Sequence, residues 1–176
     1  MKVLVAIDLQ NDFIDGTLGT REAQNIVSNA VEIIKDFKGT VIATRDTHHD
    51  NYMETSEGKN LPVVHCIEGT PGHDINVDIM KALNENKGLY AIVDKPTFGS
   101  TKLIEILKQL DKKQKITSIT AIGLCTDICV VSNVLMIKAN FPEIEIKVIE
   151  NSCAGVTPES HNAAITTMRM CQINIA

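Results

Sequence analysis

Short apolar runs alternate along the chain with stretches whose apolar residues recur at helical spacing, and this alternation strongly constrains the fold. The runs are rich in Val and Ile and have the length of buried strands. They are KVLVAID, GTVIATRD, GLYAIVDK, ITSITAIGLC, IEIKVIEN and CQINIA. Strands that alternate with helices predict a three-layer α/β/α fold with a mainly parallel sheet of roughly six strands. We expect one domain over residues 1–176, because no repeat or linker interrupts the pattern.

The helices are expected at residues 21–38, 76–88, 100–113, 127–140 and 157–170. Ser100 is the expected N-cap of the helix at 100–113, and Gly39 and Gly88 are expected stop signals. The stretch 127–140 is apolar nearly all round, which predicts a buried helix. One long irregular section, from about residue 47 to residue 76, holds four of the five histidines. A connection of that length predicts a functional segment.

Charge and composition exclude several classes of protein. The formal net charge is −5, so neither nucleic acid nor an anionic membrane is expected as a partner. The start, MKVLVAIDLQNDF, is too short and too polar for a signal peptide or a membrane span, and a cytoplasmic location is therefore expected. In that compartment the five cysteines should be reduced. No CxxC pair signals a zinc knuckle or a thioredoxin-type site.

Four of the predicted strands end in Asp8, Asp46, Lys95 and Cys125, and Cys129 follows at the start of a helix. Ligands bind beyond the carboxyl ends of the strands in open α/β sheets, so these groups should share one rim. A helix start and a nearby lysine both favour a thiolate, and Cys129 is expected to have both. A carboxylate could take the thiol proton, and backbone N–H groups could hold an oxyanion. The set predicts acyl transfer to water through a thioester.

Each residue taken alone also has a structural interpretation. Asp8 and Asp46 could cap turns, Lys95 could lie on the surface, and Cys125 and Cys129 could fill the core. The functional interpretation is preferred because all five residues fall at the same predicted edge of one sheet.

The motifs AIDLQNDF, DKPTFGS and GLCTDICV, in this order, resemble the isochorismatase-like cysteine hydrolases, with nicotinamidases the nearest group. The resemblance runs over nearly the whole chain and implies a Rossmann-like fold. It implies a catalytic triad of Asp8, Lys95 and Cys129. It also implies a cis peptide bond between Leu124 and Cys125, which would direct the backbone N–H of Cys125 toward the oxyanion beside the N–H of Cys129.

The irregular section contains the motifs TRDTHH and HCIEGTPG. The resemblance maps a divalent metal site onto Asp46, His48 and His65, with Glu57 as the candidate for a further ligand. Zinc is the first expectation, and iron or manganese also suits nitrogen and oxygen ligands. The alternative for any one histidine is a surface position in a loop, and that interpretation is kept for His49 and His73.

The resemblance implies hydrolysis of nicotinamide to nicotinate and ammonia. Phe13 and Phe98 are candidate walls of the substrate pocket, with ordinary core packing as the alternative. Thr47, Leu61 and Ile128 stand where many nicotinamidases have aromatic residues, so another small amide or ureide stays open as substrate. Two rivals are an isochorismatase-type hydrolase and a binding or redox-sensing module without turnover. Members of this family form dimers or larger assemblies, so a homo-oligomer stays open, and the sequence selects no assembly.

Three cysteines and one histidine receive structural interpretations. Cys66, Cys153 and Cys171 are expected in the core or in strands. His161 is expected to be a hydrogen-bonding residue near the last helix.

Overall fold

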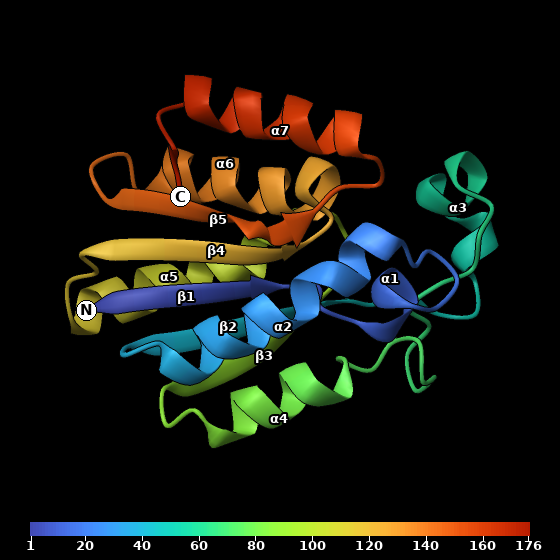
Figure 1. The fold of residues 1–176 in the computed structure, drawn as a ribbon, viewed down its shortest axis with the longest axis horizontal. Coiled ribbons are helices and arrows are strands. Elements are labelled where there is room, and N and C mark those ends of the chain that lie inside the picture. The colour runs from blue at the N-terminus through green and yellow to red at the C-terminus, as the bar shows by residue number, and fades with distance from the viewer.

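A six-stranded parallel sheet forms the centre of the protein in the computed structural model, which describes residues 1–176 (Figure 1). The strand order is β3-β2-β1-β4-β5-β6, and every neighbouring pair runs parallel. The predicted parallel sheet is therefore confirmed. The strands are β1 (Lys2–Ile7), β2 (Thr40–Asp46), β3 (Leu89–Lys95), β4 (Ser118–Leu124), β5 (Glu145–Ala154) and β6 (Asn174–Ile175).

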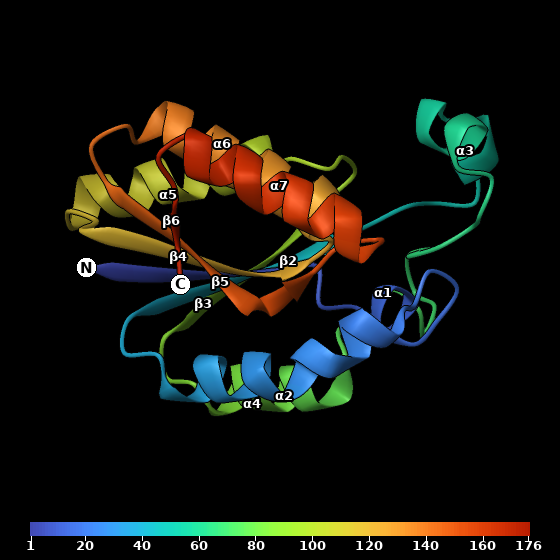
Figure 2. The same ribbon diagram turned by 45° about the horizontal axis from the view of Figure 1, so that its top comes forward.

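Helices cover both faces of this sheet and complete the predicted three layers (Figure 2). On one face lie α2 (Arg21–Asp36) and α4 (Val77–Glu85), and on the other lie α5 (Thr101–Lys113), α6 (Val131–Asn140) and α7 (Pro158–Met170). Two short helices, α1 (Asn11–Ile14) and α3 (Ser56–Asn60), lie beyond the carboxyl ends of the strands. None of the helices combines the length and the apolar character that a membrane crossing requires.

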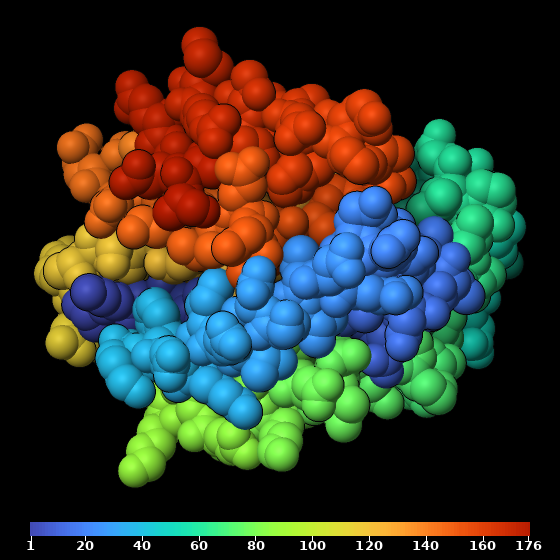
Figure 3. All heavy atoms as spheres, in the orientation of Figure 1, coloured from blue at the N-terminus to red at the C-terminus, as the bar shows by residue number.

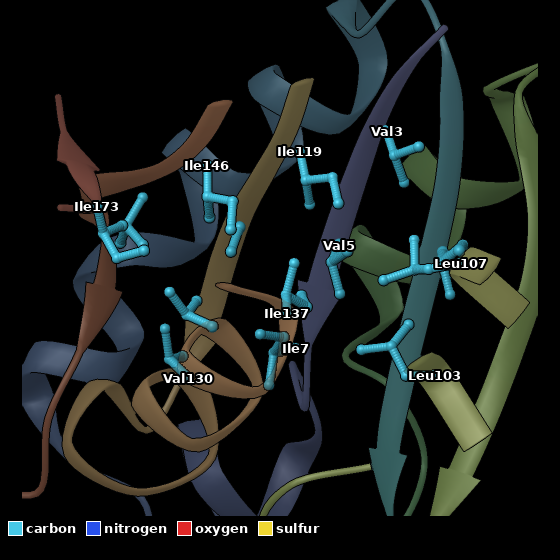
Figure 4. Close-up of a cluster of buried hydrophobic side chains, with 14 of the residues drawn as sticks. Val3, Val5, Ile7, Leu103, Leu107, Ile119, Val130, Ile137, Ile146 and Ile173 are labelled. Atoms are coloured by element: carbon cyan, nitrogen blue, oxygen red, sulfur yellow. The ribbon is translucent and has the colours of Figure 1, made fainter. Parts of the chain in front are cut away.

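Strand β1 contributes to both hydrophobic cores, which explains its continuous apolar sequence. Its odd-numbered residues Val3, Val5 and Ile7 pack with α5, α6 and α7, and Figure 4 shows this cluster. The even-numbered Leu4 and Ala6 pack with α2 and α4 on the opposite face. Successive side chains of a strand point to opposite faces, so a strand covered on both sides must be apolar throughout. The core therefore holds the carboxyl end of β1 rigidly at the middle of the sheet.

Polar caps fix where several helices begin. The Oγ of Ser100 accepts a hydrogen bond from the backbone N–H of Leu103 at 3.1 Å, as an N-cap should. Thr20 caps α2 in the same way, and Thr157 begins α7 with a reciprocal pair of bonds to Ser160. Each of these helices starts after the carboxyl end of a strand, so the caps help to fix the loops at that edge of the sheet.

The structure differs from the sequence-based expectation at three places. The expected helix 127–140 begins with a π turn, Thr126–Val130, before α6 starts at Val131. The last strand has only two residues, so Cys171 is an exposed C-cap of α7, and its expected place in a strand or core was wrong. The Gly39 and Gly88 stop signals lie beyond the true helix ends, because α2 ends at Asp36 and α4 at Glu85.

The long section from residue 47 to residue 76 passes across the carboxyl ends of the strands. It contains the short helix Tyr52–Glu54 and α3. In the space-filling view this section forms one end of the molecule, beside α1 and the start of α2 (Figure 3). It therefore covers the rim at which the strand-end residues meet.

Candidate active site

Three residues from separate segments converge at the carboxyl ends of the strands. Asp8 follows β1, Lys95 ends β3, and Cys129 lies in the π turn after β4. The Nζ of Lys95 is 2.7 Å from the Oδ2 of Asp8 and 3.4 Å from the Sγ of Cys129. The same Nζ also lies 3.3 Å from the Oδ1 of Asp46, at the end of β2. The predicted juxtaposition of a carboxyl, an amine and a thiol is therefore present in the structure.

Asp8 is held by β2 on one side and faces the lysine on the other. Its φ of 48° lies in the left-handed region, which Asp tolerates better than most residues. The hydroxyl of Thr44 donates to the Oδ1 of Asp8 at 2.6 Å. The buried Oδ2 makes the ion contact with Lys95 but has no hydrogen bond of good geometry. This oxygen therefore keeps the capacity to accept a proton.

The protonation preferences of Asp8 and Lys95 follow from burial and proximity. Burial raises the pKa of Asp8, and the Lys95 ammonium offsets only part of that rise. Burial also works against the ammonium form of Lys95, but the nearby Asp8, Cys129 and Asp46 outweigh it and raise the pKa of Lys95. A carboxylate with a raised pKa is a stronger base than an ordinary one.

Cys129 differs from the expectation that its thiolate is favoured. Burial and the neighbouring Asp8 carboxylate raise the pKa of the Cys129 thiol well above its usual value, and Lys95 lowers it only in part. The charge of Lys95 is shared with two carboxylates, so it cannot stabilise the sulfur alone. The direction of this shift favours the protonated thiol of Cys129 next to the Asp8 carboxylate.

Cys125 lies at the start of the π turn that leads to Cys129. The peptide bond between Leu124 and Cys125 is cis, as the resemblance implied. Burial raises the pKa of the Cys125 thiol to about 12, so this thiol is a poor nucleophile. The next residue, Thr126, has its hydroxyl 2.9 Å from the Nδ1 of His161 in α7. His161 is thus a hydrogen-bonding residue, as expected.

Asp46, His48, Glu57 and His65 form a group that could hold a metal ion. One ligand atom from each residue lies within 4.8 Å of the others. The Oδ2 of Asp46 is 2.9 Å from the Nε2 of His48 and 3.5 Å from the Nε2 of His65. The Oε1 of Glu57 is 3.5 Å and 3.6 Å from the same two nitrogens. Two imidazoles and two carboxylates suit a divalent transition metal.

One atom of this group tests the fit to a cation. The Nε2 of His48 is buried and has no hydrogen-bond partner of good geometry. A buried polar atom without a partner is costly, and a metal ion at this point would satisfy it. The Nδ1 of His65 lies 2.8 Å from the carbonyl oxygen of Val63, which leaves its Nε2 directed at the group. The donor set therefore fits the cation that the sequence predicted.

The carboxylates set the protonation of the group when it holds no ion. Burial works against the ionised form of Asp46, but the neighbouring His48 and His65 and the Lys95 ammonium outweigh it and lower the pKa of Asp46 below its usual range. Burial likewise lowers the pKa of His48, but Asp46 and Glu57 outweigh it and raise that pKa to about 9. A proton on His48 would compete with a metal ion, because the ligand must be the neutral imidazole.

Gln10 and Asp12 are supporting residues that the sequence analysis missed. The Nε2 of Gln10 donates to the carbonyl oxygens of Asp46 and His73, and its Oε1 accepts from the N–H of Asp46 at 2.7 Å. The Oδ2 of Asp12 accepts from the N–H of Cys66 at 2.7 Å, next to His65. Both residues stand in the motif AIDLQNDF, so polar residues directly after a predicted strand were the available signal. Only the structure shows that these two side chains are buried.

The two histidines assigned no metal lie apart from the group. His49 is exposed and faces Glu68, as expected for a surface loop. The surface position expected for His73 was wrong: its ring is buried, and its Nε2 lies 2.9 Å from the hydroxyl of Thr47. Two of the remaining cysteines, Cys66 and Cys153, are buried as expected.

A cavity of about 730 Å³ adjoins Cys129 and the four candidate ligands. Phe13 and Phe98 line it, as predicted, together with the aliphatic Leu61 and Ile128. Asp8 and Lys95 are fully buried beneath Cys129. A ligand in the cavity would thus meet the sulfur first.

Comparisons with known proteins find relatives of this chain over nearly its whole length. The family model described as Isochorismatase domain matches residues 2–175. The nicotinamidase/pyrazinamidase of Mycobacterium tuberculosis is 24% identical, with 99% of this chain and 98% of the relative covered. The nicotinamidase of Schizosaccharomyces pombe is 26% identical, with 98% and 91% covered. The pyrazinamidase of Pyrococcus horikoshii in complex with zinc superimposes with a TM-score of 0.81 at 25% identity, covering 99% of this chain and 98% of the other.

Proposed function

Since the chain belongs to the isochorismatase family and is an amidohydrolase, we propose that it converts nicotinamide to nicotinate and ammonia through a thioester on Cys129. The observation that carries the proposal is the position of Lys95. Its Nζ lies within 3.4 Å of both Asp8 and Cys129, directly beneath a cavity with four candidate metal ligands. No simple packing requirement would bury an ammonium there.

The first half of the reaction forms the thioester. The carboxylate of Asp8 takes the thiol proton of Cys129, and the sulfur attacks the amide carbon to give a tetrahedral oxyanion. The backbone N–H groups of Cys125 and Cys129 are proposed to hold this oxyanion. Asp8 then gives its proton to the amine, the carbon–nitrogen bond breaks, and ammonia leaves.

The second half hydrolyses the thioester. Asp8 takes a proton from water, the hydroxide attacks the thioester carbon, and the carbon–sulfur bond breaks. Asp8 returns its proton to the sulfur, the new carboxylic acid loses its own proton to solvent, and nicotinate is released. The Lys95 ammonium stays charged throughout, because its pKa is raised by the groups around it. It stabilises the negative charge as this charge moves between Asp8 and the sulfur.

Asp46, His48, Glu57 and His65 are proposed to hold the metal ion, with zinc as the first candidate. The zinc complex of the pyrazinamidase of Pyrococcus horikoshii supports this choice. When bound, the ion would act as a Lewis acid and orient the ring nitrogen of the substrate. Phe13 and Phe98 are proposed to contact the ring, at about 0.5–1.5 kcal/mol for each aromatic pair.

Another small amide is a second candidate substrate. Leu61 and Ile128 line the cavity with aliphatic groups, at positions where many nicotinamidases have aromatic residues. Aliphatic walls contact flat rings and branched chains alike, so they give less preference for an aromatic amide.

An ammonia-release assay on a panel of amides tests both candidates. The panel should contain nicotinamide, benzamide, an aliphatic amide and a ureide, each with and without added zinc. We expect nicotinamide to have the highest kcat/KM, and Cys129→Ala to abolish ammonia release from it. A faster aliphatic amide would select the second candidate, and release by Cys129→Ala equal to that of the wild type would refute the thioester.

A further inference from the structure

We propose that Asn133 is a positioning residue that fixes the Lys95 loop against the turn carrying the nucleophile, a role that rests on the proposed function. Asn133 lies in the first turn of α6 and is completely buried. It touches no substrate group, because it does not line the cavity. Its influence must therefore pass through the backbone that it binds.

The side-chain amide of Asn133 connects two segments by three hydrogen bonds. The Nδ2 donates to the carbonyl oxygen of Cys129 at 2.8 Å and to that of Phe98 at 2.9 Å. The Oδ1 accepts from the backbone N–H of Ser100 at 2.9 Å. Two carbonyl acceptors and one N–H donor fix the orientation of the amide, since both hydrogens of the Nδ2 are used.

The segment bound by Asn133 is the loop that follows Lys95. The Nζ of Lys95 donates to the carbonyl oxygen of Thr97 at 3.1 Å, so the loop also holds the ammonium. A Cβ added to Gly99 would lie 2.5 Å from the Sδ of Met136, which shows how closely the loop approaches α6. A shift of this loop would change the distance between the Lys95 ammonium and the Cys129 sulfur.

An apolar residue could fill the space of Asn133 but could not replace its bonds. The N–H of Ser100 would lose its acceptor, and the carbonyl oxygen of Phe98 would lose its donor. The loop would then be free to move away from α6 to reach water. The buried amide thus couples the position of Lys95 to that of Cys129.

The variant Asn133→Asp tests this coupling with little change of shape. It keeps an oxygen for the N–H of Ser100 but replaces both donors with an acceptor. Asn133→Ser serves as the second variant if the aspartate does not fold. Ile137→Ala is the matched control, because Ile137 is buried one turn further along α6 and lies outside the loop. All are assayed as full chains with zinc, well below their unfolding temperatures.

One readout requires no substrate. Iodoacetamide is added, and mass spectrometry gives the alkylation rate of Cys129 relative to that of the exposed Cys171. We expect this ratio to fall about tenfold in Asn133→Asp and kcat to fall about 10- to 100-fold, as for a small misplacement of reacting groups. Ile137→Ala should lower the unfolding temperature but keep the ratio and kcat within about twofold.

A ratio in Asn133→Asp or Asn133→Ser that is unchanged or higher than in the wild type would overturn the positioning role. The same conclusion would follow if Ile137→Ala changed the ratio as much as they did. If the wild type released no ammonia from any amide, the proposed function would fail, and the alkylation ratio would still decide the role of Asn133.

Discussion

Replacing Lys95 with methionine should destabilise the protein strongly, because the change leaves carboxylates buried without a cation. The Nζ–Oδ2 distance of 2.7 Å between Lys95 and Asp8 corresponds to about 6 kcal/mol of attraction at an effective dielectric constant of about 20. Keeping the charges out of water costs several kcal/mol, which offsets much of this attraction. Removing only one partner leaves the other charge buried without a counter-ion, which typically costs about 3–5 kcal/mol.

Protonation of Asp8 sets an upper limit on this loss. The unfolded carboxyl has a pKa near 3.9, so holding Asp8 neutral at pH 7 costs about 4 kcal/mol. We therefore expect Lys95→Met to lose about 3–4 kcal/mol of unfolding free energy at pH 7. The folded variant then binds a proton that the unfolded chain does not bind. The loss of unfolding free energy in Lys95→Met, relative to the wild type, should therefore shrink by about 1.4 kcal/mol per pH unit as the pH falls from 7 toward 5.

Urea unfolding of the metal-free proteins at several pH values measures this deficit. The double variant Asp8→Asn/Lys95→Met is the matched control, because it lacks the carboxyl that takes up the proton. It should be more stable than Lys95→Met at pH 7, and its deficit should not vary with pH through Asp8. A deficit of Lys95→Met below about 1 kcal/mol, or one that is independent of pH, would refute the assignment of a strongly coupled buried pair.

Three further predictions concern the reaction and the metal. Cys125→Ala should keep ammonia release within about tenfold of the wild type in steady-state assays, since the mechanism uses only the backbone of this residue; a loss near that of Cys129→Ala would contradict it. The pH profile of kcat/KM should fall on the acid side at a pH above about 4, because Asp8 has a raised pKa and its protonated form cannot take the thiol proton; a profile flat down to pH 4 would rule out this base. Glu57→Gln should weaken zinc binding at least about tenfold in a competition titration with a chromogenic chelator, whereas the exposed Glu54→Gln should not; equal affinities would remove Glu57 from the ligand set.

The sequence alone determined the three layers of the fold and which residues lie at the carboxyl edge of the sheet. Apolar runs of strand length that alternate with helices leave few arrangements other than a covered parallel sheet. In such a sheet every carboxyl end lies at one edge, so Asp8, Asp46 and Lys95 had to lie at that edge. The adjacency of β3, β2 and β1 in the structure makes them neighbours. Local patterns carry this information, because strand length and helical spacing are local properties.

The tertiary structure alone decided the distances and the protonation. The π turn before α6 and the two-residue strand β6 depend on packing between distant segments, and no local pattern predicted them. The Cys129 pKa expected from a helix start and a lysine was wrong in direction, because burial and Asp8 outweigh both. Burial and the sharing of one ammonium among Asp8, Asp46 and Cys129 exist only after folding has brought these groups together.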